Sequence, residues 1–160
     1  MYNFMMDTEY IVSRLQCTRE GKQDLLYMVR QLVELAFCAR DQGLLSMEIL
    51  LEDKARFPDP FLRKAAQITM EISDPENIRR VLYNVIYTTA AYKANHRFLE
   101  GVIIIETMLA ISQKEDLDYI FFYLLPSYFG MEYEESVIDV YRNFKKGLVH
   151  EAALEVESKG

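Results

Sequence analysis

The spacing of apolar residues constrains this chain more than any other feature. Glycine and proline are sparse, with six and four in 160 residues, and the apolar residues between them recur every three or four positions rather than every second one. This period is typical of amphipathic α-helices and not of strands. The pattern therefore predicts an all-α fold, a single compact helical bundle of about six to eight helices with almost no strand.

Two Asp-Pro pairs indicate where helices begin. In Asp59-Pro60 and Asp74-Pro75 the aspartate oxygen can accept hydrogen bonds from free amide groups, while proline occupies the first helical position without losing a needed donor. Gly43 is a candidate stop for a long helix, because glycine tolerates the left-handed turn that ends many helices. We expect one domain that spans residues 1–160 and ends in a frayed tail over 147–160. The expected helices cover residues 8–20, 22–42, 44–53, a segment that begins at 60, a segment from 75 towards 98, and residues 98–111, 116–125 and 131–146.

The charge balance argues against a nucleic-acid partner. Lys and Arg number 18 against 25 Asp and Glu, a net charge of −7, and basic residues gather no more densely than pairs such as Arg79-Arg80. Binding to a phosphate backbone draws on larger clusters of Lys and Arg. We expect no nucleic-acid binding.

Targeting signals are also missing from the sequence. The longest apolar stretches fall far short of the roughly 18 residues that a membrane-spanning helix needs. The first residues lack a basic start followed by an apolar core, so they do not predict a secretory signal. Cys17 and Cys38 are too few for a disulfide framework. A cytoplasmic protein without a membrane-spanning segment is therefore expected.

Residue patterns that carry catalysis are not found. His96 and His150 are the only histidines, and neither has further ligands at metal-binding spacing on its helical face. No glycine-rich phosphate loop and no nucleophile motif is present. The sequence predicts no enzymatic activity, no metal and no cofactor.

Three residues are secondary candidates for a functional role. Glu106 lies within an apolar run, where an ionised side chain needs a partner to offset its desolvation, so it is either a buried switch or a carboxylate that turns outwards or pairs with Lys or Arg. Phe122 and Tyr128 belong to an aromatic stretch over residues 119–133. Such a stretch is either an exposed docking surface or part of the core.

Particular segments resemble a known family. Residues 31–48, QLVELAFCARDQGLLSME, resemble the cytoplasmic loop of the MotA family, the flagellar stator subunits among the MotA/TolQ/ExbB proton channels. Residues 59–67 and the helix expected from 74 are similar to the elements that follow in that loop. Residues 106–126 resemble the C-terminal cytoplasmic tail, which ends in a comparable Leu-Pro. The resemblance covers about residues 22–126.

The resemblance implies a docking role rather than ion conduction. The membrane helices that carry the family's pore have no counterpart here, and a chain without a membrane path conducts no ions. In the family, one Arg and one Glu of the loop engage the rotor protein FliG, and the resemblance places them at Arg40 and Glu48. A helix continuous through Gly43 would bring these side chains roughly 12 Å apart along the axis and about 80° around it. Arg40 and Glu48 could then contact the same partner. The alternative is that they are two ordinary solvated charges without a partner-binding role.

The leading hypothesis is a non-catalytic, MotA-like interaction module in the cytoplasm, near the inner membrane at the flagellar motor. Its expected partner is FliG or another motor component. A second hypothesis is a scaffold that forms homo-oligomers through the aromatic residues 119–133. A third is an enzyme that uses Glu106 and nearby tyrosines, which would need an enclosed pocket beside that carboxylate.

Overall fold

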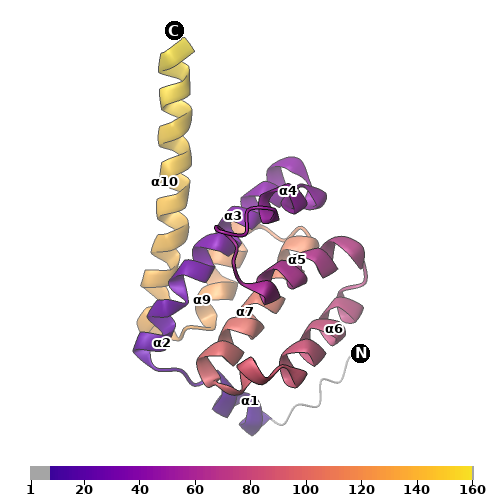
Figure 1. Ribbon diagram of the computed structural model, residues 1–160. Helices are drawn as coiled ribbons and strands as arrows, with labels where there is room; N and C mark the ends of the chain where they lie inside the picture. The colour runs from indigo at the N-terminus through magenta and orange to yellow at the C-terminus, as the bar shows by residue number, and fades with distance from the viewer. Residues whose placement is uncertain (1–7, 160) are drawn as a thin grey trace.

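The computed structural model describes residues 8–159, so residues 1–7 and 160 of the predicted domain lie outside the described part (Figure 1). Every regular element within residues 8–159 is helical, which confirms the all-α prediction. Six of these helices have at least eight residues. In chain order the elements are α1 (Thr8–Leu15), α2 (Arg19–Asp24), α3 (Leu26–Gln42), η1 (Leu44–Ser46), α4 (Met47–Leu51), α5 (Pro60–Glu71), α6 (Pro75–Thr88), η2 (Ala90–Lys93), α7 (Asn95–Ser112), α8 (Leu117–Tyr119), η3 (Ile120–Leu124), α9 (Leu125–Ser127), η4 (Met131–Tyr133) and α10 (Glu134–Lys159).

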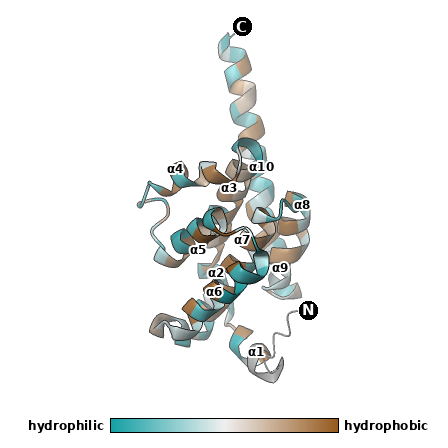
Figure 2. Ribbon diagram, turned by 90° about the vertical axis from the view of Figure 1, so that its right-hand side faces the viewer, coloured by the Kyte–Doolittle hydropathy of each residue, from teal (hydrophilic) through white to brown (hydrophobic). Residues whose placement is uncertain are grey.

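Helix α7 is the centre of the core, as the apolar run over residues 98–111 predicts. Helices α3, α5 and α6 pack around it, with α1 at one end. Hydrophobic and hydrophilic residues are mixed along these helices (Figure 2), and the side chains buried between them are almost all apolar. The chain does not break at Gly101; instead it packs closely there, because an added Cβ would lie 3.1 Å from Ile86 and 3.2 Å from the Tyr92 ring. The buried residues of α7 are Phe98, Leu99, Gly101, Val102, Ile103, Ile104, Ile105, Thr107, Met108, Leu109, Ala110 and Ile111.

Both Asp-Pro pairs begin helices as predicted. The Asp59 carboxylate accepts a hydrogen bond from the Phe61 amide at 3.0 Å, and the Asp74 carboxylate accepts one from the Glu76 amide at 3.0 Å. Pro60 and Pro75 occupy the first helical positions of α5 and α6. A side chain and a rigid ring thus define each start.

Two expected boundaries differ from the structure in the middle of the chain. Helix α6 ends at Thr88 rather than continuing towards Phe98, and the turn η2 places the Tyr92 ring in the core beside Gly101. The helical segment that begins at Leu117 passes through a π-helical turn, η3, and includes Pro126 in α9 instead of stopping before it.

The C-terminal helix is much longer than predicted. The turn η4 precedes it, and α10 then runs from Glu134 to Lys159, straight through Gly147. The expected helix end at residue 146 is therefore wrong, since α10 continues through the described part of the stretch that was expected to be a frayed tail, 147–160. The first part of α10 packs on α3 and α9, and the second part projects from the bundle (Figure 1).

Candidate functional site

The candidate site is the corner where α3 gives way to α4, and Gly43 forms it. Gly43 has φ 93° and ψ 158°, a conformation that is essentially restricted to glycine. Its amide donates to the Ala39 carbonyl at 2.9 Å, which closes the last turn of α3. The Ser46 hydroxyl donates back to the Cys38 carbonyl at 3.1 Å. These contacts fix the direction in which the chain leaves α3.

The corner corrects the expected geometry of Arg40 and Glu48. The helix is not continuous through Gly43, so the spacing estimated for one helix is wrong. Arg40 lies in the last turn of α3, whereas Glu48 lies in the first turn of α4. Both side chains are exposed, but they border two different grooves on either side of the corner.

Arg40 is anchored by local contacts. Its Nε donates to the neighbouring Asp41 carboxylate at 3.0 Å, and its guanidinium lies 4.5 Å from the centroid of the Phe37 ring. About half of the Arg40 side chain stays exposed, 53%. A guanidinium held over a ring presents its remaining donors in a fixed place. The groove beside it, about 540 Å³, lies between the end of α3 and the segment that follows α7.

Glu48 borders a groove of about 630 Å³ between α4 and α5. Arg63 of α5 donates to the Leu51 carbonyl at 2.9 Å, which joins the two helices at this place. Both acidic and basic side chains line this groove. The charged residues of the groove are Glu48, Glu52, Arg63, Lys64 and Glu71.

Two residues that sequence reasoning missed belong to this corner. Leu45 and Ile49 are 69% and 74% exposed, next to Glu48. Met47 and Leu51, each two positions further on, are buried. In a helix a shift of two residues is about 200°, so the two apolar pairs face opposite ways. The sequence could have predicted exposed apolar residues here, because only one of two apolar pairs on opposite sides of a helix can face the core.

Glu106 pairs with a cation, which confirms one of the two readings of this residue. Its carboxylate accepts hydrogen bonds from Arg79 Nη2 at 3.0 Å and from the Tyr83 hydroxyl at 2.8 Å. Burial and the Glu106 charge raise the pKa of Tyr83 and of Tyr128. Tyr128, which directly follows α9, therefore lies near enough to Glu106 for the carboxylate charge to act on its hydroxyl.

The aromatic stretch over residues 119–133 is mostly core. Phe121 and Phe129 are buried, and Phe122 is half-buried with its ring 5.1 Å from the Tyr141 ring. Tyr119 and Tyr123 are the exceptions, with exposed fractions of 46% and 68%. One face of this stretch therefore packs in the core, and a narrow face with Tyr119 and Tyr123 is exposed to solvent.

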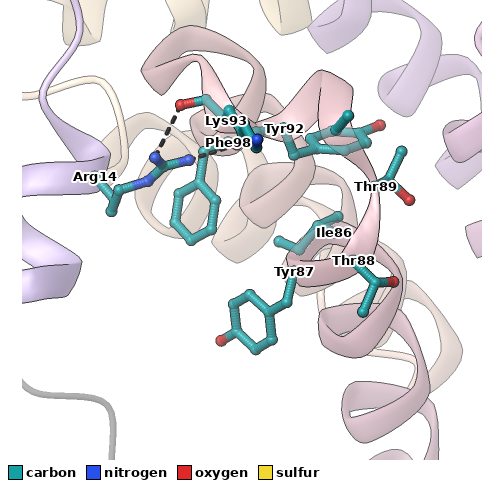
Figure 3. A pocket seen from close by; sticks show the side chains of 9 residues that line it. Arg14, Ile86, Tyr87, Thr88, Thr89, Tyr92, Lys93 and Phe98 are labelled. Atoms are coloured by element: carbon teal, nitrogen blue, oxygen red, sulfur yellow. Dashed lines mark hydrogen bonds between the residues drawn. The ribbon is translucent and has the colours of Figure 1, made fainter.

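A further cavity of about 560 Å³ lies between α1 and the end of α6 (Figure 3). Arg14 reaches into it from α1, donates to the backbone carbonyls of Tyr92 and Lys93, and stacks 4.6 Å from the Phe98 ring centroid. Both outer guanidinium nitrogens are thereby engaged by the protein itself. These contacts fasten α1 to η2.

Residues 8–159 contain neither a metal cluster nor a helix able to span a membrane. In this part of the chain no three His, Cys, Asp or Glu side chains gather as a metal site would require. Among the same residues, no helix combines the length and the apolar character that crossing a bilayer requires.

Comparisons of the chain with protein-family models, with curated proteins and with solved structures find no match. None of these comparisons supports the resemblance to the MotA family, which stays a prediction from the sequence segments alone. Within those segments Gly43 forms the corner, and Arg40 and Glu48 lie on either side of it.

Proposed function

We propose that this protein is a non-catalytic interaction module that docks on a protein partner through the corner between α3 and α4. The docking surface comprises Arg40, Leu45, Glu48 and Ile49, and is called the corner surface below. The observation that carries the proposal is the exposure of Leu45 and Ile49 beside the exposed Glu48 carboxylate. Scattered single apolar residues on a surface are ordinary, but a pair one helical turn apart between charges is typical of a contact site.

The composition of the corner surface suits a contact that forms and breaks. A small apolar centre supplies the burial, and the charges at its rim set orientation and association rate more than affinity. Arg40 and Glu48 carry opposite charges on either side of Gly43, so a partner with the complementary order of charges is favoured and the reversed order is penalised.

The proposed partner follows from the resemblance to the MotA family. In that family the matching Arg and Glu contact the rotor protein FliG, and we propose the same class of partner here, a flagellar rotor component at the cytoplasmic face of the motor. The proton pathway of the family is not part of the proposal.

The test is a titration of the protein with FliG at low and at raised salt. Wild type should bind, and raised salt should weaken binding because the rim charges are screened. Arg40→Glu and Glu48→Lys should each slow association at least tenfold. Arg80→Glu is the matched control, since Arg80 is also exposed but lies on α6. Equal binding by all four proteins would refute the role of the corner surface.

A scaffold that self-assembles through the aromatic stretch is the second candidate. The observation that favours it is the exposure of Tyr119 and Tyr123, which are one helical turn apart, with Met131 90% exposed nearby in the chain. The half-buried Phe122 is a poor test position because its loss would disturb Tyr141. Tyr123→Ser should reduce multimer formation in sedimentation if this candidate is correct, and a monomeric wild type would refute it.

A further inference from the structure

Two carboxylates meet where the start of α5 packs on α7. Asp59 is the residue from which α5 begins, and Glu100 lies in the second turn of α7. Their side chains are within hydrogen-bonding distance of each other. The Glu100 side chain is only 12% exposed, so little water can screen one carboxylate from the other. Two carboxylates this close resist being ionised together, and a proton held between them removes the repulsion.

One cation faces this carboxylate pair. Arg97 Nη1 donates to Glu100 Oε1, and the guanidinium lies 5.4 Å from the centroid of the Tyr92 ring. Lys64 of α5 lines the cavity of about 270 Å³ that Asp59 and Arg97 also border. The charges that act on Glu100 are those of Arg97 and Asp59. With a proton between the carboxylates these three groups are neutral together, and without it they carry a net negative charge.

The half-buried charged side chains on the other helices around α7 have partners of their own. These partnerships are Arg14 with the carbonyls of Tyr92 and Lys93, Glu34 with Arg56, Arg63 with the Leu51 carbonyl, and Arg79 with Glu76 and Glu106. The balance at the joint therefore depends on Arg97 and on the proton of the Asp59–Glu100 pair.

Of the two helices that meet here, α5 has the freer end. Residues 52–56, which lead to α5, are exposed, whereas Glu100 is followed by Gly101, where α7 packs closely on its neighbours. The Asp59 carboxylate also accepts a hydrogen bond from the Phe61 amide at 3.0 Å. Movement of Asp59 away from Glu100 would therefore deprive the first turn of α5 of its cap.

We propose that the contact between Asp59 and Glu100 is a pH-sensitive switch that holds the first turn of α5 on α7. In the closed state a proton shared by the two carboxylates keeps them together. When the proton leaves, their repulsion favours an open state in which the Phe61 amide is exposed to water. The same turn lines the groove beside Glu48, so the open state changes the shape of that groove. The switch does not depend on the partner proposed for the corner surface.

The pH range of the switch follows from the environment of Glu100. Burial raises the pKa of Glu100 to about 7, the Arg97 guanidinium opposes the shift, and Asp59 adds to it. In the open state the carboxyl meets water, and its pKa returns towards the ordinary value of 4.5. The closed state thus holds the proton more tightly. The open population should therefore grow as the pH rises from 4.5 to 7, and grow no further above 7 through this group.

Hydrogen exchange at the Phe61 amide of the full chain tests the switch. The protection factor compares the observed exchange rate with that of an unstructured chain at the same pH. For Phe61 it should fall at least tenfold between pH 5.5 and pH 8. It should also be lower than that of the Met108 amide in the middle of α7, since a local opening exposes Phe61 alone. Equal protection of the two amides, or no fall at Phe61, would overturn the proposal.

Three variants assign the effect to the carboxylate pair. In Glu100→Gln the amide donates to Asp59 at every pH, so the Phe61 protection factor should no longer fall between pH 5.5 and pH 8. Glu71→Gln is the matched control, the same change at the exposed far end of α5, and should respond to pH as wild type does. A fall that persists in Glu100→Gln, or disappears in Glu71→Gln, would overturn the proposal.

The third variant, Asp59→Asn, tests the shared proton itself. Asparagine caps a helix as well as aspartate does, so α5 should still begin at the same residue. One of the two carboxylates is gone, however, and the fall in Phe61 protection between pH 5.5 and pH 8 should be smaller than in wild type. A fall as large as that of wild type would show that Glu100 titrates through burial alone, which would overturn the shared proton.

Discussion

Arg79 of α6 and Glu106 of α7 form an ion pair, with 3.0 Å between Arg79 Nη2 and Glu106 Oε2. The Glu106 side chain is 19% exposed and also accepts the Tyr83 hydroxyl. This network explains how a carboxylate is tolerated within the most apolar helix of the fold. It also joins two neighbouring helices of the core, which makes it a structural feature whose loss should be measurable.

Removing one member of this pair should cost more than removing both. Arg79→Met leaves the Glu106 carboxylate half-buried without its cation, and we expect a loss of about 2–3 kcal/mol in the free energy of unfolding. The double variant Arg79→Met with Glu106→Leu should be less damaging, because no charge is left to desolvate. Urea denaturation at pH 7 measures both. A double variant that loses as much free energy of unfolding as Arg79→Met alone, or more, would contradict this expectation.

The same substitution should have opposite effects at two glycines. Gly43→Ala should destabilise by about 1–3 kcal/mol, because its positive φ is strained for any residue with a Cβ even though no atom lies within 4 Å of that carbon. Gly147→Ala, in the exposed middle of α10, should raise helicity and stability of the projecting segment by up to about 1 kcal/mol. Denaturation and circular dichroism measure the two effects. If both substitutions stabilise the protein, or both destabilise it, then the positive φ of Gly43 or the helical conformation of Gly147 is wrong.

These two glycines show how far the sequence could predict the fold. The three-to-four spacing predicted the all-α class, and the Asp-Pro pairs predicted the starts of α5 and α6 to the residue. Glycine, however, permits both a helix end and helix continuation. Gly43 ends α3, whereas at Gly147 the helix goes on into alanine- and glutamate-rich sequence that favours helix. A rule that treats both as stops is correct at the first and wrong at the second.

The stability of the protein should depend on pH through Glu100 of α7. Burial raises the pKa of Glu100 to about 7, the Arg97 guanidinium opposes the shift, and the Asp59 carboxylate adds to it. Below pH 4.5 the side chain is protonated in both the folded and the unfolded chain. Between pH 4.5 and pH 7 the unfolded chain has already released this proton while the folded chain still holds it, so the free energy of unfolding falls as the pH rises. Above pH 7 both states are ionised and the free energy of unfolding falls no further through this group.

Glu100→Gln isolates this contribution. The variant should equal wild type near pH 4 and exceed its free energy of unfolding by about 2 kcal/mol near pH 8, since the amide has no proton to lose. Denaturation at a series of pH values measures the difference. A difference that is constant from pH 4 to pH 8 would show that Glu100 does not titrate in this range.

The candidate site was only partly predictable. Arg40 and Glu48 were identified from the resemblance, and both are exposed. Their relative placement was missed because it depends on the direction in which the chain leaves α3 at Gly43, and the sequence predicts a helix end there without giving that direction. Leu45 and Ile49 were missed because apolar residues in a predicted helix are assigned to the core by default. Only the packing of α4 on α5 decides that Met47 and Leu51 are the inner pair.

The proposed contact between a rotor component and the corner surface is best tested by a footprint of the complex. Hydrogen exchange of the protein is measured alone and with saturating FliG. We expect slower exchange over residues 40–52 and unchanged exchange in α5, α6 and α7. Exchange that stays the same over residues 40–52, or slows only elsewhere in the chain, would contradict it.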